Sequence, residues 1–148
     1  MNETNQAEIL LVEDNQDDLD MALRSLREAN VANNIQVARD GEEALAFIFG
    51  GSAQAGPELK NRPRLVLLDL RLPKIDGLEV LRRLKEDPRS RMISVVVLTS
   101  SKEQKDVIES YKLGTNSYIV KPVDFKGFVA AMQELGMYWL LLNQPPQP

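Results

Sequence analysis

The sequence predicts one α/β domain in which helices cover both faces of a five-stranded parallel sheet. The first observation is that short apolar segments alternate with segments of helical spacing, five times along the chain. The second is that the apolar segments are almost continuously hydrophobic, as is typical of strands buried on both faces. The third is the length of 148 residues, which fits one domain of ordinary size.

Five segments are expected to be strands because they are short and rich in branched aliphatic side chains. They are residues 8–13, 35–38, 64–69, 94–99 and 117–120. In a doubly wound sheet, functional residues are expected at the carboxyl ends of the strands.

Helices are expected between these strands, with boundaries that turn and capping residues indicate. The expected helices cover residues 19–30, 40–49, 78–87, 101–114 and 124–139. Asp40 with Glu43, and Ser101 with Gln104, have the spacing of a capping box. Gly114 stands where a helix-terminating glycine belongs, and Asp124 can cap the last helix.

Two surface features have simple interpretations. Residues 50–62 form a glycine-containing connection, longer than the usual two to six residues or so of such folds. Arg82, Arg83 and Lys85 are interleaved with acidic residues, which indicates a solvated helix face rather than a basic patch.

Composition excludes several classes of function. The chain has 18 basic and 22 acidic residues, and its net charge of −4 argues against a nucleic-acid-binding surface. It has no Cys and no His, which excludes disulfides, thiol nucleophiles, His-dependent triads and imidazole zinc sites. Residues 1–7 lack the apolar stretch of a signal peptide, and no apolar run approaches the ~20 residues that a bilayer requires. We therefore expect a cytoplasmic protein without membrane contact.

Acidic side chains collect at the carboxyl ends of two predicted strands. Glu13 and Asp14 follow the first strand, and Asp69 ends the third. Two carboxylates ~4 Å apart repel by ~4 kcal/mol at an effective dielectric near 20, so a cation is needed to stabilise such a group. Because all available ligands are hard oxygens, the expected cation is a single Mg²⁺.

The same edge of the sheet carries the residues that phosphoryl chemistry requires. Thr99 ends the fourth strand and can donate a hydrogen bond, and Lys121 follows the fifth and adds a positive charge. No Cys or His nucleophile exists, but a carboxylate can itself attack phosphorus and form an aspartyl phosphate. Asp69, at the centre of the sheet, is the best-placed nucleophile.

Four motifs in this order resemble the response-regulator receiver domain of two-component signalling. They are LVEDN at 11–15, LLDLRLPKIDG at 67–77, VVLTS at 96–100 and YIVKP at 118–122, and the resemblance extends from Glu8 to Trp139. It implies the strand order 2-1-3-4-5. We expect a flexible segment at 1–7, a receiver domain at 8–142 and a disordered tail at 143–148.

The resemblance also implies roles for individual residues. It implies that Asp69 is the phosphoacceptor, that Thr99 and Lys121 contact the phosphoryl group, and that Tyr118 is an aromatic switch. The implied metal ligands are Glu13, Asp14, Asp69 and the backbone carbonyl of Arg71. A cis peptide bond is implied before Pro122. Arg71 stands where many receivers have a smaller polar residue, and the small Ser100 leaves space for phosphoryl entry.

Within this family, the chain looks most like the small regulators encoded with bacterial and cyanobacterial phytochromes. The shared features are the long loop before the third strand, the RPRLVLLDLRLPKIDG stretch and a final helix that ends in Tyr138-Trp139-Leu140. This resemblance implies a sensor histidine kinase as phosphoryl donor, and the expected kinase is a phytochrome. The expected output is a changed protein–protein contact, without enzymatic turnover of an outside substrate.

The last helix has more apolar residues than one core-facing stripe requires. They either pack on the domain's own flank or form a homodimer interface on the side built by the fourth helix, fifth strand and fifth helix. Tyr138, Trp139 and Leu141 are the candidate interface residues.

Two other functions compete with the phosphorylation switch. A Mg²⁺-dependent phosphatase with an aspartyl nucleophile needs a second acid two residues after the nucleophile, where this chain has Arg71. A receiver that works only as an inert interaction module would not need the complete set of acids, hydroxyl and lysine.

Overall fold

Five parallel strands form one sheet in the order β2-β1-β3-β4-β5, which confirms the predicted topology. The computed structural model describes residues 8–28, 34–50, 58–99, 109, 111–115, 117–121, 126, 127, 129, 130 and 133. The strands are β1 (Ile9–Val12), β2 (Ile35–Ala38), β3 (Leu65–Asp69), β4 (Ser94–Thr99) and β5 (Ser117–Val120). The helices are α1 (Gln16–Glu28), α2 (Gly41–Phe49) and α3 (Gly77–Glu86). Most residues of the fourth and fifth expected helices lie outside the described residues.

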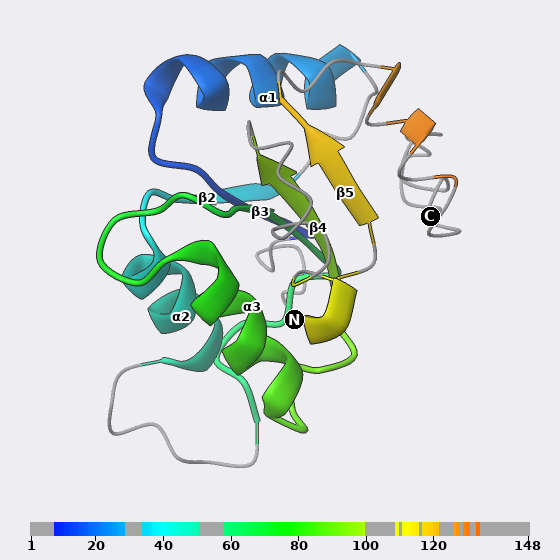
Figure 1. The fold of residues 1–148 in the computed structure, drawn as a ribbon. Helices are drawn as coiled ribbons and strands as arrows, with labels where there is room; N and C mark the ends of the chain where they lie inside the picture. The colour runs from blue at the N-terminus through cyan, green and yellow to red at the C-terminus, as the bar shows by residue number, and fades with distance from the viewer. Residues whose placement is uncertain are drawn as a thin grey trace, which may run out of the picture.

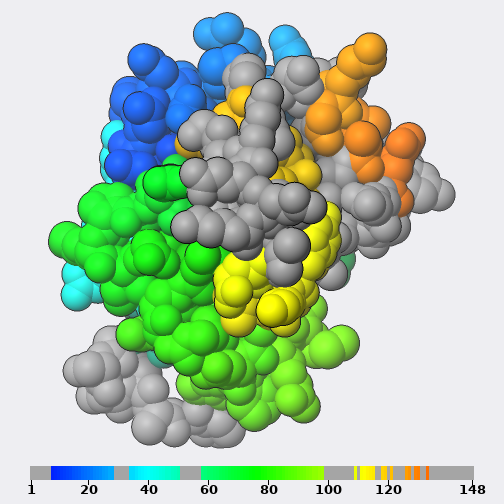
Figure 2. Space-filling view, viewed as in Figure 1, coloured from blue at the N-terminus to red at the C-terminus, as the bar shows by residue number. Residues whose placement is uncertain are grey.

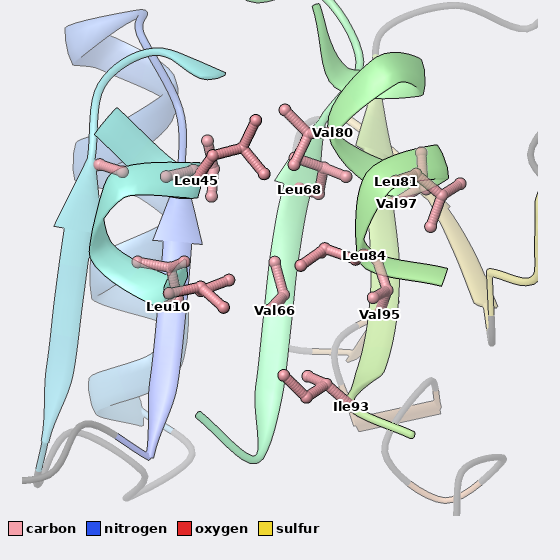
Figure 3. Packing of buried hydrophobic residues seen from close by; sticks show 14 of the residues in the cluster. Leu10, Leu45, Val66, Leu68, Val80, Leu81, Leu84, Ile93, Val95 and Val97 are labelled. Carbon is pink, nitrogen blue, oxygen red and sulfur yellow. The ribbon is translucent and has the colours of Figure 1, made fainter. Parts of the chain in front are cut away.

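Helices cover both faces of the sheet: α1 lies on one face, and α2 and α3 lie on the other (Figure 1). Successive side chains of a strand point to opposite faces, so each strand contributes to two cores. Leu11 and Leu67 pack in the core under α1, whereas Leu10 and Leu68 pack in the core under α2 and α3. Figure 3 shows the second core, where side chains of the two helices meet β1, β3 and β4.

Capping residues fix where the helices begin and end. The Asp40 carboxylate accepts a hydrogen bond from the Glu43 N–H at 2.7 Å, and the Glu43 carboxylate accepts one from the Arg39 N–H at 2.6 Å. This confirms the predicted helix start at Asp40. Gly114 has a φ of 105°, which confirms its role as a terminating glycine. The caps predicted at Ser101 and Asp124, and the end predicted at Asn30, lie outside the described residues.

The outer face of α3 is ion-paired, as the charge pattern predicts. Arg82 pairs with Glu79 and Glu86, and Arg83 also pairs with Glu79. The interpretation of Lys85 as part of this solvated face is wrong. Its stem is half-buried, and its ammonium donates to a backbone carbonyl before β4, that of Ile93, at 2.7 Å.

The strand register brings the predicted functional positions to one edge of the sheet. Val12 of β1 lies opposite Leu68 of β3, so the next residues, Glu13 and Asp69, are neighbours. In the space-filling view, the blue surface of α1 adjoins the green surface of the segment from β3 to α3 (Figure 2). By strand alternation, Asp69 shares the face of Leu65 and Leu67, which α1 covers.

No helix in the described part of the chain has the length and apolar character needed to cross a membrane.

Candidate functional site: a carboxylate cluster around Lys121

Three carboxylates meet at the carboxyl edge of the sheet. Glu13, Asp14 and Asp69 each place one carboxylate oxygen within 4.8 Å of the others. The side chains of Glu13 and Asp69 are 1% and 4% exposed, whereas Asp14 is exposed. Two carboxylates of the cluster are therefore buried, while that of Asp14 is open to solvent, so a small ion can reach the cluster.

The ammonium of Lys121 joins the buried carboxylates. Its Nζ lies 2.9 Å from Oε1 of Glu13, 2.8 Å from Oδ2 of Asp18 and 3.1 Å from Oδ2 of Asp69. The Lys121 side chain is only 9% exposed, so these contacts replace most of its solvation. Buried charges of this kind are tolerated only when they are paired and hydrogen-bonded.

Burial and pairing shift the ionisation of both partners. The pKa of Glu13 is raised to about 7, because burial and, to a lesser degree, the charge of Asp69 outweigh the opposing effects of Lys121 and of the Asn15 N–H. Burial also works against the charge of Lys121. Its hydrogen bonds with Asp18 and Glu13, and the charge of Asp69, outweigh that effect and raise the pKa of Lys121.

The start of α1 positions two of these acids. Asn15 caps the helix, because its side-chain oxygen accepts a hydrogen bond from the Asp18 N–H at 2.9 Å. The Asn15 N–H donates to Oε2 of Glu13 at 3.2 Å. One residue thus orients the Glu13 carboxylate and sets the helix turn that carries Asp18.

Asp18 is the site residue that the sequence analysis missed. An acid in the first helical turn is common because it interacts favourably with the helix dipole, so Asp18 gave no distinct signal. The signal that could have identified it is the Asn15 cap, which starts α1 directly after β1 and so keeps its first turn near the carboxyl end of that strand.

Tight backbone packing holds the segment that follows Asp69. The Arg71 N–H donates to Oδ1 of Asp69 at 3.3 Å, and the Gly77 N–H donates to the Leu70 carbonyl at 2.9 Å. A Cβ atom at Gly77 would lie 2.2 Å from the carbonyl oxygen of Asp69 and 2.5 Å from Cα of Leu70. Only glycine therefore fits behind the Asp69 backbone.

The other predicted site residues are placed to different extents. Thr99 ends β4 opposite Val120, at the expected edge, but its side chain lies outside the described residues. Tyr118 is half-buried and stacks on Tyr111, with ring centroids 6.5 Å apart. Arg71 contributes the hydrogen bond to Asp69, and its role as a metal ligand stays a prediction. The positions outside the description are Ser100, Pro122, Tyr138, Trp139 and Leu141.

The charge balance of the site favours a divalent cation. With all groups ionised, Glu13, Asp14, Asp18 and Asp69 carry four negative charges against the one positive charge of Lys121, which leaves −4 + 1 = −3. A divalent cation would lower this imbalance to −1, and the donor set consists only of hard oxygens. The residues present therefore fit Mg²⁺ or a similar ion.

We expect Lys121→Met to lower the free energy of unfolding by roughly 2–4 kcal/mol, because Glu13 and Asp69 would stay buried without their cation. Saturating MgCl₂ should restore stability to this variant more than it stabilises the wild type. Urea denaturation with and without MgCl₂ measures both effects. Lys126→Met, at an exposed lysine, is the matched control and should change little. A variant as stable as the wild type would contradict this account.

We expect Gly77→Ala to weaken Mg²⁺ binding by about tenfold or more, since a Cβ there displaces the backbone that carries Asp69. Gly114→Ala is the control: its φ of 105° makes an added side chain unfavourable, but the atoms nearest to that side chain belong to the stem of Lys85 and not to the carboxylate cluster. The control should lower stability without changing Mg²⁺ affinity. Calorimetric titration of both folded variants measures the difference, and equal affinities would be the opposing result.

The family model of the response regulator receiver domain matches residues 9–133 of this chain. Response regulator Rcp1 of Synechocystis is 40% identical over 132 residues, which are 89% of this chain and 88% of that protein. The probable methanogenesis regulatory protein FilR2 of Methanothrix harundinacea is 40% identical over 143 residues, with 95% and 88% covered.

Solved structures show the same fold. The bacteriophytochrome response regulator RtBRR has a TM-score of 0.80 and 46% identity, covering 95% of this chain and 84% of its own. The Mn²⁺-bound form of Rcp1 has a TM-score of 0.71 and 38% identity, with 94% and 98% covered. The phosphorylated cyanobacterial phytochrome response regulator RcpA has a TM-score of 0.73 and 36% identity, with 96% and 99% covered. The chain thus belongs to the response regulator receiver family and is related to the phytochrome response regulators.

Proposed function

We propose that this chain is a phosphorylation switch that accepts a phosphoryl group on Asp69 from a sensor histidine kinase. The observation that carries the proposal is the contact between Asp69 and Lys121 beside the Glu13–Asp14 pair. At the carboxyl edge of the sheet, it combines a carboxylate nucleophile, a fixed positive charge and a set of carboxylate oxygens that can bind a cation. The relation to phytochrome response regulators supports a phytochrome as the kinase.

The proposed step is a transfer between two residues. An oxygen of the Asp69 carboxylate attacks the phosphorus of a phosphohistidine on the kinase. The P–O bond forms as the P–N bond breaks, and the imidazole of the kinase leaves with the bonding electron pair and takes up a proton. The product is an acyl phosphate, which water can cleave, so the modification is transient.

Mg²⁺ is the proposed cofactor, and Glu13, Asp14 and Asp69 are the side chains that would hold it. The backbone carbonyl of Arg71 is proposed as a further ligand. The ion would supply positive charge that neutralises the phosphoryl oxygens as the transfer proceeds. A relative of this chain is described as Mn²⁺-bound, which supports a divalent cation here.

Phosphorylation is proposed to act through competition for Lys121. A phosphoryl group on Asp69 adds negative charge close to the ammonium, which Glu13 and Asp18 now share with Asp69. Lys121 and the Thr99 hydroxyl would then turn toward the new oxygens, and Tyr118 would follow. The related RcpA is described as phosphorylated, which supports a modification at this site.

The output is proposed to be a changed protein–protein contact in the cytoplasm, without turnover of an outside substrate. Self-association through the side that includes β5 is one such contact. Tyr138, Trp139 and Leu141, the candidate interface residues, lie outside the described residues, so this interface stays a prediction.

Incubation with acetyl phosphate and MgCl₂ tests the phosphoacceptor by intact-protein mass spectrometry. The wild type should gain the mass of one phosphoryl group, and Asp69→Asn should gain none. Asp17→Asn, at an exposed acid of α1, is the control and should be labelled like the wild type. Labelling of Asp69→Asn would contradict the proposal, as would an unlabelled wild type with both acetyl phosphate and the cognate kinase. Steady hydrolysis of a phosphomonoester would contradict the absence of turnover.

A further inference from the structure

An open groove of about 800 Å³ lies at the opposite edge of the sheet from the carboxylate cluster. One wall is the segment 58–64, which leads into β3, and the other is the segment 88–93, which leads into β4. Both walls lie at the amino ends of strands, whereas Asp69 ends β3. The groove is therefore separate from the proposed phosphorylation site by the length of the strand.

The groove concentrates positive charge in a chain whose net charge is −4. Its walls carry Lys60, Arg62, Arg64 and Arg89 against one carboxylate, that of Glu58. Arg89 pairs with Asp87 at 2.9 Å, and Arg64 lies 4.0 Å from Glu8. Within the part of the chain that the structure describes, no carboxylate lies at ion-pair distance from Lys60 or Arg62. Among the described residues, the charges of Lys60 and Arg62 are therefore not neutralised by a carboxylate and can attract an anionic group.

An apolar side chain stands beside these cations. Met92 lines the groove and is 78% exposed. A methionine is flexible and polarisable, so it can pack against apolar side chains of different shape. A small inorganic anion would use the cations but not Met92, whereas a peptide with acidic and apolar residues would use both.

Hydrogen bonds hold both walls in place before any ligand arrives. Nη1 of Arg62 donates to the Arg89 carbonyl at 2.8 Å and so joins the two walls. The Lys60 N–H donates to the Ile48 carbonyl at 2.9 Å, which ties the first wall to α2.

The second wall is tied to α3 in the same way. The Lys85 ammonium donates to the carbonyls of Arg91 and Ile93, and the buried Ser90 hydroxyl donates to the Leu84 carbonyl at 2.7 Å. A groove that is already ordered loses little conformational entropy when it binds.

We propose that this groove docks an acidic segment of a partner protein, with carboxylates on Lys60 and Arg62 and an apolar side chain on Met92. Charge complementarity with Lys60 and Arg62, which have no carboxylate partner among the described residues, identifies the partner's chemistry. This docking would be independent of Asp69, so a partner could be held at one edge of the domain while phosphorylation occurs at the other.

Fluorescence anisotropy with a labelled peptide of alternating Glu and Leu tests the proposal. The wild type should bind it, and the Gln-for-Glu version of the peptide should bind at least about tenfold more weakly. Lys60→Glu with Arg62→Glu should weaken binding by about tenfold or more, because each attraction becomes a repulsion. Arg24→Glu with Arg27→Glu, on exposed positions of α1, makes the same change of charge elsewhere and should leave affinity within about twofold. Asp69→Asn should bind like the wild type.

Several outcomes would overturn the proposal. They are absence of binding to the Glu–Leu peptide, equal binding of the Gln peptide, or equal loss in the two charge-reversed variants. Inorganic phosphate that shifts the amide resonances of Leu59 and Met92, while the peptide does not, would make the groove a small-anion site instead. Loss of a dimer in light scattering of Lys60→Glu with Arg62→Glu would make it an interface between two copies.

Met92→Ala separates the contribution of charge from that of apolar packing. It should weaken peptide binding by a few fold without loss of stability, since Met92 is exposed.

Discussion

The candidate site at the carboxyl edge of the sheet depends on one interaction, the contact of the Lys121 ammonium with three carboxylates. Glu13 and Asp69 are buried neighbours of like charge, and Lys121 is the cation that makes this arrangement tolerable. Asp18 holds the same ammonium from the side of α1. The remaining negative charge would repel an anionic phosphoryl group, and a divalent cation bound by the carboxylates would offset that repulsion.

Strand register and side-chain alternation bring these site residues together. Parallel register places the ends of β1 and β3 side by side, and strand alternation directs Asp69 to the face that α1 covers. Gly77 allows the following helix to pack directly behind the Asp69 backbone. The segments that lead into β3 and β4 form the basic groove at the opposite edge, so the groove and the carboxylate cluster have opposite charge.

Sequence reasoning predicted the features that depend on local pattern. The apolar runs predicted all five strands, and carboxylates after β1 and β3 predicted the cluster, because strand ends of a parallel sheet share an edge. Asp18 and Lys85 were not predicted, since the partners of each side chain come from elsewhere in the fold. Asp18 contacts a lysine 103 residues away, and Lys85 bonds carbonyls in the turn before β4. An exposed helical charge and a half-buried one look the same in sequence.

Calorimetric titration of MgCl₂ into the wild type and Asp14→Asn tests the central claim most directly. Asp14 is the exposed member of the cluster, so its replacement leaves the buried contacts of Lys121 unchanged. The account predicts one Mg²⁺ per wild-type chain and markedly weaker binding to the variant. Absence of binding to the wild type, or equal affinity in the two proteins, would contradict the claim that these carboxylates form a metal site.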